Sequence, residues 1–452
     1  MRKSIYIVSG IISVILLLGY FFYLQPRLPI INGYAAKMTC TCLFVSDRKL
    51  STIKEQDLNM SPLNLVDLEV DNTKKTVNAE LFGLGKESAI YKDGLGCVLL
   101  QDDDNYKITY KNQRPFLLWS NNELPFPYGR KDTTLTTSNL DQKIIQKAMD
   151  LAFDKTGIHD KTTRAIVILH KDTLVAEKYA EGFSKDTPIL GWSMTKSITN
   201  ALIGILVKQG KINVTSPLKI PEWEHDTARK KITLDNLLRM NSGLFWEEDY
   251  TGVSTVTNML FNSESAYEAA VNQPLEYEPG THWEYSSGTT NILSGVIRNL
   301  FDTHIEYLAF PYIELFLKLD MTSAQLETDE AGNYVLSSYC TATPRDWAKL
   351  GLLYLHNGKW KEEQILPDGW VDYSIKPTPY SDNLKYGAQL WLNTNKNYFP
   401  DAPEDLFFFS GFQGQHVIVI PSKDLVIVKM GLKNAQDFDM NGVIRTIIEA
   451  IN

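Results

Sequence analysis

Hydrophobic residues are concentrated at the N-terminus of the chain. After Arg2 and Lys3, the stretch SIYIVSGIISVILLLGYFFYLQPR runs for about twenty residues without a charge, which as a helix spans a bilayer core of roughly 30 Å. Its aromatic run YFFY is typical of a membrane interface, and the basic pair favours a cytoplasmic end. We therefore expect a cytoplasmic tail (1–4) and an uncleaved transmembrane anchor (5–24), with the rest of the chain exported to the periplasmic or extracellular face. Cleavage as a signal peptide near GYAAKM (33–38) is the alternative.

The next segment, residues 33–120, carries short β-type runs separated by polar stretches, namely CTCLFVS, AELFGL, GCVLL and YKITY. This pattern predicts a small β-rich exported module. Residues 121–139 are polar, contain proline and are rich in Ser and Thr, as expected of a linker.

Three of the four cysteines lie in this module, and exported thiols can oxidise. Cys40 and Cys42 are too close along an extended chain to pair easily with each other. Cys97 is therefore the expected partner of one of them, and the sequence leaves open which one. A Cys-x-Cys metal site is disfavoured because no second pair of His or Cys with ligand spacing lies nearby.

Residues 140–452 change to longer patterns. A helical repeat, LDQKIIQKAMDLAFDK, begins at Leu140, and two hairpin signals at 163–183 and 415–432 flank about 230 residues of mostly helical pattern. We predict an α+β domain in which one antiparallel sheet is built from both ends of this region. Helices would flank the sheet and form a second, helical lobe, with a site between the lobes.

Composition excludes some functions. The chain has 452 residues, 44% hydrophobic and 22% charged, with a formal net charge of −9, which gives no reason to expect a nucleic-acid partner. Its seven histidines are scattered, so neither a metal centre nor a cofactor is expected. The motifs G-x-S-x-G and H-E-x-x-H are absent. The oligomeric state is left open.

The motif Ser-x-x-Lys could supply a nucleophile and the lysine that activates it. The motif alone is weak evidence, because it occurs four times in the chain. Only Ser193 begins a helical run that is apolar on nearly every side before Gly210 ends it. The others lie in polar stretches or a proline loop. The four pairs are Ser46/Lys49, Ser51/Lys54, Ser193/Lys196 and Ser216/Lys219.

The spacing of Ser193 and Lys196 places both side chains on one helix face, one turn apart. Burial and the helix dipole both disfavour a charged ammonium at a helix start, so we expect a lowered pKa for Lys196. A neutral lysine can take the serine proton, and the Ser193 backbone N–H can meet a developing oxyanion. The alternative is a capping serine beside a lysine that reaches solvent.

The segment SMTKSITNALIGILVKQGKI resembles the first motif of the β-lactamase-related serine hydrolases. This family includes class C β-lactamases, D-Ala-D-Ala peptidases, esterases and 6-aminohexanoate-dimer hydrolases. The resemblance covers roughly residues 140–450, implies a β-lactamase/transpeptidase-like fold, and does not include the N-terminal module. Further segments follow in the family's order: ITLDNLLRMNSGLFWEEDY, PGTHWEYSSGTTNILSGVI, TATPRDWAKLGLLYLHNG, YGAQLWLN and FFFSGFQGQHVIVIPSKDLVIV.

The first two motifs imply the catalytic set. By the resemblance, Ser193 is the acylated nucleophile, Lys196 its activator, and Tyr285 the tyrosine that passes a proton to the leaving group. The second motif reads Tyr285-Ser286-Ser287 and lacks the family's asparagine, with Ser287 in its place.

The third motif departs further. Phe409-Ser410-Gly411 falls where class C enzymes have Lys-Thr-Gly, and this strand edge implies a second oxyanion donor, the backbone N–H of Phe412. The family's lysine helps to hold the carboxylate of a β-lactam or a peptide. With Phe409 at that position, the case for a penicillin-type substrate is weaker.

The Tyr-Ser-Ser motif and the WEEDY loop favour the 6-aminohexanoate-dimer hydrolase and esterase branch. Trp246 and Tyr250 of that loop are candidates to line the substrate site, although loop aromatics are as often packing residues. We therefore expect a membrane-anchored serine hydrolase that cleaves a small ester or amide through an acyl-enzyme on Ser193.

Three alternatives remain open from the sequence. The chain is instead a β-lactamase or a cell-wall D,D-peptidase, or it is a catalytically idle surface-binding protein on the same fold. In the third, the N-terminal module has the main role and binds an envelope polymer or a partner.

Overall fold

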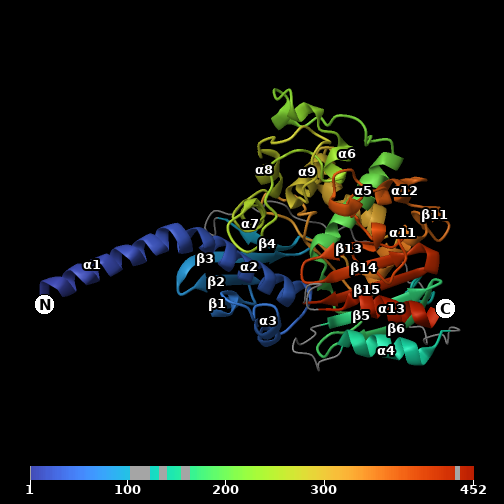
Figure 1. Ribbon diagram of the computed structural model, residues 1–452, viewed down its shortest axis with the longest axis horizontal. Helices are drawn as coiled ribbons and strands as arrows, with labels where there is room; N and C mark the ends of the chain where they lie inside the picture. The colour runs from blue at the N-terminus through green and yellow to red at the C-terminus, as the bar shows by residue number, and fades with distance from the viewer. Residues whose placement is uncertain (1, 102–122, 132–139, 154–162, 433–437, 452) are drawn as a thin grey trace.

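The computed structural model describes residues 2–101, 123–131, 140–153, 163–432 and 438–451 (Figure 1). The YKITY run, expected as a strand, and most of the expected linker lie outside these residues.

A six-stranded antiparallel sheet is built from both ends of the C-terminal region, as predicted. Its order is β12-β13-β14-β15-β5-β6, so the late strand β15 pairs with the early strand β5 (Figure 1). The first hairpin turns at Lys171 and Asp172, both in the left-handed region of backbone conformation. The strands are β5 (Thr163–His170), β6 (Thr173–Tyr179), β12 (Trp391–Leu392), β13 (Phe407–Gly411), β14 (Gln415–Ile420) and β15 (Leu425–Gly431).

The two faces of this sheet bury alternate side chains against different helices. Val417 and Val428 belong to the main core, whereas Ile418 and Ile427 belong to a second core on the opposite face. This period of two follows from strand geometry. Helix α11 (Pro344–Leu355) packs on the first face, and α4 (Gln142–Phe153) and α13 (Met440–Ile451) cover the second.

The region between the hairpins forms the expected helical lobe, in which α5 (Thr195–Lys208) is the central helix. Twelve of the fourteen residues of α5 are buried. Ser193 lies two residues before this helix, in a 3₁₀ turn over Trp192–Met194, and does not cap it through its side chain. The other lobe helices are α6 (Leu234–Leu238), α7 (Thr255–Phe261), α8 (Ala266–Val271), α9 (Ser287–Arg298), α10 (His304–Pro311) and α12 (Trp370–Ile375). Small sheets pair β7 (Ile189–Leu190) and β8 (Gln325–Leu326) with β9 (Cys340–Ala342), and β10 (Lys359–Trp360) with β11 (Glu363–Gln364).

The N-terminus forms one long helix from Arg2 to Val45, apolar and long enough to cross a membrane in its first part. The expectation of a strand at CTCLFVS was wrong, because these residues continue the helix. Several residues of α2 are fully buried, so its apolar runs reflect burial on several sides rather than a strand. The helix comprises α1 (Arg2–Gly19), a π-helical turn (Tyr20–Leu24), a 3₁₀ turn (Gln25–Arg27), α2 (Leu28–Cys40) and a second π-helical turn (Thr41–Val45).

The rest of the module is a four-stranded antiparallel sheet packed against α2 (Figure 1). Residues of α2 and of this sheet belong to the same hydrophobic core as α5 and α9. The module therefore packs as part of the main body of the molecule. Its elements after α2 are α3 (Leu50–Gln56), β1 (Val66–Asp71), β2 (Thr76–Leu81), β3 (Leu84–Lys92) and β4 (Gly96–Leu100).

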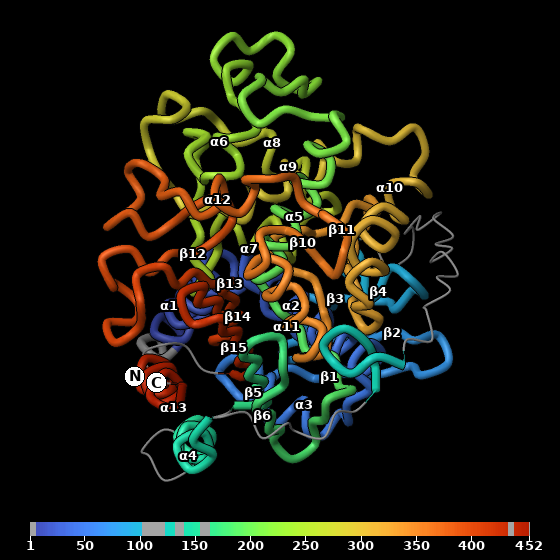
Figure 2. Tube along the Cα trace, turned by 90° about the vertical axis from the view of Figure 1, so that its right-hand side faces the viewer, coloured from blue at the N-terminus to red at the C-terminus, as the bar shows by residue number. Residues whose placement is uncertain are grey.

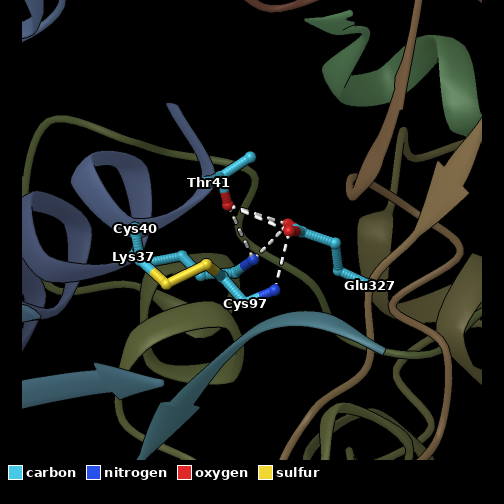
Figure 3. Close-up of a disulfide and its surroundings, with 5 residues drawn as sticks. All are labelled: Lys37, Cys40, Thr41, Cys97 and Glu327. Atoms are coloured by element: carbon cyan, nitrogen blue, oxygen red, sulfur yellow. Dashed lines mark hydrogen bonds and ion pairs between the residues drawn. A yellow bond between two sulfur atoms is a disulfide. The ribbon is translucent and has the colours of Figure 1, made fainter. Parts of the chain in front are cut away.

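A disulfide and a buried ion pair lie where α2, β4 and the lobe meet (Figure 3). Cys97 pairs with Cys40, which answers the question left open by the sequence, and Cys42 stays free. Beside the disulfide, Lys37 of α2 forms an ion pair with Glu327, and both side chains are almost completely buried. Glu327 also accepts hydrogen bonds from the Cys97 backbone N–H at 2.9 Å and from the Thr41 hydroxyl.

We expect Glu327→Ala to destabilise the protein by about 3–5 kcal/mol, because it leaves the Lys37 ammonium buried without its partner charge. The double variant Lys37→Met/Glu327→Leu removes both charges and should recover roughly half of that loss. Chemical denaturation of the three proteins measures the difference. Equal destabilisation by the single and the double variant would contradict this account.

Candidate active site

Ser193 is presented by a sharp turn between β7 and α5. The residue before it, Trp192, has a φ of 50°, a backbone conformation that residues other than glycine rarely adopt. The preceding Gly191 lies so close to β13 that a Cβ on Gly411 would meet its carbonyl oxygen at 2.0 Å. This close approach joins the turn to the end of the central sheet and holds Ser193 between the two lobes.

Lys196 lies one turn further, on the first turn of α5, and is 2% exposed. Its Nζ donates to the Ser193 Oγ at 3.1 Å, to the Ser287 Oγ at 2.9 Å and to the Ser337 carbonyl oxygen at 3.0 Å. Burial lowers the pKa of Lys196 to about 8, although the nearby Glu248 carboxylate opposes this. The alternative of a lysine that reaches solvent is wrong for this residue.

Tyr285 lies on the other side of the serine. Its ring centroid is 4.9 Å from the Lys196 Nζ, so the phenol lies beside the amine that contacts Ser193. Burial and the Glu248 charge raise the pKa of Tyr285 above its usual value, so the phenol stays protonated at neutral pH. Its ring rests against Trp391 of β12, with centroids 5.1 Å apart.

Glu248 is the group that the sequence reading missed. Its carboxylate accepts from the Ser287 hydroxyl at 2.5 Å and from the Ser287 backbone N–H, at the start of α9, at 2.8 Å. A continuous chain of polar contacts therefore runs from Ser193 through Lys196 and Ser287 to Glu248. The WEEDY loop offers three adjacent acids, and nothing in the local pattern distinguishes Glu248 from its exposed neighbours.

The two aromatic residues predicted to line the site both bind this carboxylate. Trp246 donates its indole N–H to Glu248 at 2.6 Å and is buried, while the Tyr250 hydroxyl donates at 2.9 Å. Tyr250 remains 38% exposed and stacks on Phe412 with ring centroids 5.7 Å apart. Trp246 thus orients the carboxylate, and Tyr250 with Phe412 forms the exposed edge of the site.

The end of β13 carries the residues predicted from the third motif. Phe412 follows the strand and packs edge-on against Trp192 at 5.5 Å, beside the nucleophile. Phe409 is fully buried against Tyr354, so its position presents an apolar ring rather than a cation. Ser410 is half-buried opposite His416, and within the described residues no hydrogen bond joins its hydroxyl to Ser193 or Lys196.

The N-terminal helix also reaches the site. Tyr34 of α2 stacks on Trp192 with ring centroids 6.0 Å apart and rings nearly parallel at 13°. The same ring packs edge-on against Phe261, at the end of α7, at 5.7 Å. The N-terminal module therefore supports the turn that carries Ser193, which the sequence did not indicate.

Comparison with known proteins agrees with this geometry. The sequence profile of the family named Beta-lactamase matches residues 143–450, which is more than half of the chain. The chain belongs to this family. The match confirms the resemblance drawn from the motifs and the expected β-lactamase/transpeptidase-like fold.

Individual relatives are more distant. The 6-aminohexanoate-dimer hydrolase of Paenarthrobacter ureafaciens is 24% identical over 301 residues, which cover 60% of this chain and 73% of that protein. A solved structure of a putative 6-aminohexanoate-dimer hydrolase from Bacillus anthracis superposes with a TM-score of 0.52 at 22% identity, covering 65% of this chain and 78% of that one. A putative β-lactamase from Bacteroides dorei gives 0.53 at 18% identity, with 69% and 99% covered. At these identities the structures support the fold.

We expect the rate at which a fluorophosphonate labels Ser193 to rise with pH through about 8, because only the neutral Lys196 amine can accept the serine proton. Glu248→Gln removes a negative charge that raises the Lys196 pKa, so the midpoint of this profile should move to lower pH. Glu247→Gln, at the exposed neighbouring position, is the matched control and should leave it in place. A midpoint in Glu248→Gln at or above that of the unmodified protein would contradict the assignment.

Proposed function

We propose that the protein is a serine hydrolase that cleaves a small ester or amide through an acyl-enzyme on Ser193. One observation carries the proposal: a buried lysine with a pKa of about 8 donates a hydrogen bond at 3.1 Å to a serine hydroxyl on a strained turn. In its neutral form this amine is a base within reach of the serine proton.

In the first step, Ser193 Oγ attacks the carbonyl carbon while neutral Lys196 accepts its proton. Tyr285 is protonated at neutral pH and can deliver a proton to the leaving alcohol or amine. The Lys196 ammonium then returns its proton to Tyr285 and is neutral again. In the second step Lys196 takes a proton from the water that attacks the acyl-enzyme, and this proton passes to Ser193 Oγ as the acid is released. The backbone N–H groups of Ser193 and Phe412 are the proposed donors to the oxyanion.

Glu248 and Ser287 are proposed as positioning residues for Lys196. Ser287 accepts from the lysine and donates to Glu248, so its hydroxyl is oriented by two fixed partners. Glu248 in turn is held by three donors other than that hydroxyl, from Trp246, Tyr250 and the Ser287 backbone. This network limits the positions open to the Lys196 amine.

The substrate class follows from the third motif. Phe409 is buried against Tyr354, so this position supplies no positive charge for a substrate carboxylate. This supports a neutral ester or amide over a β-lactam or a cell-wall peptide. The relative from Paenarthrobacter ureafaciens is named a 6-aminohexanoate-dimer hydrolase, which is compatible with this class.

The location is proposed from the N-terminal helix. Its first part is apolar and unburied, with a mean hydropathy of 2.3 over the best window, as a membrane anchor requires. We propose that it holds the hydrolase at the exported face of the membrane.

Ser193→Ala should lower p-nitrophenyl acetate hydrolysis by at least a factor of about 10³, because the acyl-enzyme cannot form. The control is Ser216→Ala/Lys219→Ala, which removes a second Ser-x-x-Lys pair whose two residues are exposed, and it should retain full activity. Full activity in Ser193→Ala would refute the proposal.

A neutral p-nitrophenyl ester should be hydrolysed with a kcat/KM at least about tenfold above that for an anionic chromogenic cephalosporin, since a lost ionic contact costs about 1.4 kcal/mol or more. Steady-state kinetics with both substrates on the same preparation measure the ratio. A preference for the cephalosporin would assign the chain to the β-lactamase alternative instead.

A further inference from the structure

The membrane helix enters the hydrolase without a flexible linker. The helix runs from Arg2 to Val45, and its second half is the buried helix α2. The disulfide from Cys40 and the ion pair of Lys37 fix α2 to the body of the molecule. The direction in which α1 leaves the body, seen in Figure 1, therefore sets which face of the hydrolase meets the bilayer.

The loop that carries Glu248 and Tyr250 lies at the point where the helix enters the body. A methyl group added to Gly252 would lie 3.8 Å from the guanidinium of Arg27, the last residue before α2. Tyr250, at the exposed edge of the active site, lies two residues before Gly252. Val253 follows Gly252 and is 42% exposed. The edge of the active site therefore lies close to Arg27, where the N-terminal helix enters the body of the protein.

A second element brings apolar side chains to the same place. The turn between β2 and β3 contacts the start of α2, where a Cβ on Gly85 would lie 2.7 Å from Leu28 Cβ. Asn32 of α2 also donates to the carbonyls of Leu84 at 2.9 Å and Gly85 at 2.6 Å. At this turn Phe82 is 65% exposed.

Leu65 is part of the same edge of the module sheet. Strand β1 pairs with β2 so that Val66 faces Leu81, which places Leu65 next to Phe82. Leu65 is 49% exposed. Exposed apolar side chains therefore flank the emerging helix on two sides, from the module turn and from the active-site loop. We call this set the exit face: Leu65, Phe82, Leu84, Tyr250 and Val253.

The residues of the helix at this level suit the lipid headgroup region. Phe22 and Tyr23 are 79% and 65% exposed, and the Arg27 guanidinium lies 4.0 Å from the centroid of the Tyr23 ring. Aromatic rings and arginine are the residues enriched at this depth of a membrane. Because the exit face borders these residues, it lies at the same depth when α1 spans the bilayer.

We propose that the exit face rests on the bilayer in which α1 is anchored, and that the active site takes its substrate from that surface. The substrate class is then a membrane-resident amphiphile with an ester or amide carbonyl at headgroup level. Ser193 takes the acyl group as the ester C–O bond breaks, the alcohol leaves with a proton, and water releases the carboxylic acid. This inference rests on the proposed hydrolase activity and on the anchoring of α1.

The test uses the full chain in phosphatidylcholine vesicles with two p-nitrophenyl esters. The myristate partitions into the vesicles, and the acetate stays in water. The variant Leu65→Asp/Phe82→Asp places two charges on the exit face, outside the catalytic residues. The matched control, Ile305→Asp/Ile313→Asp, changes two similarly exposed apolar residues at α10 and the turn after it, 58% and 41% exposed. In Figure 2, α10 and α1 lie on opposite sides of the molecule.

We expect Leu65→Asp/Phe82→Asp to hydrolyse the myristate at least about fivefold more slowly and the acetate at the unmodified rate, since a charge at an interface opposes insertion. The control should keep both rates. An unchanged myristate rate in the exit-face variant, or an equal loss in the control, would overturn the proposal. The acetate assay of Ser193→Ala tests the proposed hydrolase activity, and the myristate assay of the exit-face variant tests the membrane contact. One proposal can therefore fail without the other.

A second measurement needs no variant. Unmodified protein in vesicles that contain a lipid with a photoreactive headgroup should be labelled in peptides that include residues 63–85 and 246–255. Labelling confined to peptides of α1 would overturn the exit-face proposal even where the variant folds poorly.

Discussion

Burial of the Lys196 amine is the constraint on which the rest of the site depends. An ammonium ion without solvent is costly, and this cost lowers its pKa and makes it a base near neutral pH. The amine nevertheless needs acceptors, which it finds in two serines and a backbone carbonyl. Each acceptor comes from a different part of the chain, so packing α5 between the lobes assembles the site.

The carboxylate of Glu248 balances this arrangement. It raises the Lys196 pKa against the effect of burial, and it also raises the pKa of Tyr285, which keeps the phenol as an acid. Burial, the larger effect, acts on the two groups in opposite directions: it lowers the pKa of Lys196 and raises that of Tyr285. The hydrogen bonds of Glu248 to Trp246 and Tyr250 tie its electrostatic effect to the loop at the edge of the site.

The N-terminal helix connects the apolar segment α1 to the site around Ser193. Its buried half presents Lys37 to Glu327, Cys40 to Cys97 and Tyr34 to Trp192. The first two contacts fix the orientation of the C-terminal region relative to α1, and the third supports the turn that carries Ser193. A module that reads in the sequence as a separate β-rich unit is therefore a structural support of the active site.

The sequence by itself determined the features that depend on short-range pattern: the membrane-length apolar run, the hairpins at both ends of the sheet, and the apolar helix behind Ser193. Motif order also indicated Ser193, Lys196 and Tyr285, which the structure brings together. Other features depend on contacts between distant segments, and only the tertiary structure decided them. Cys40 and Cys42 are two residues apart in a helix, so their side chains point to roughly opposite sides and only Cys40 faces β4. Glu248 differs from Glu247 and Asp249 only because the start of α9, some forty residues later, lies beside it.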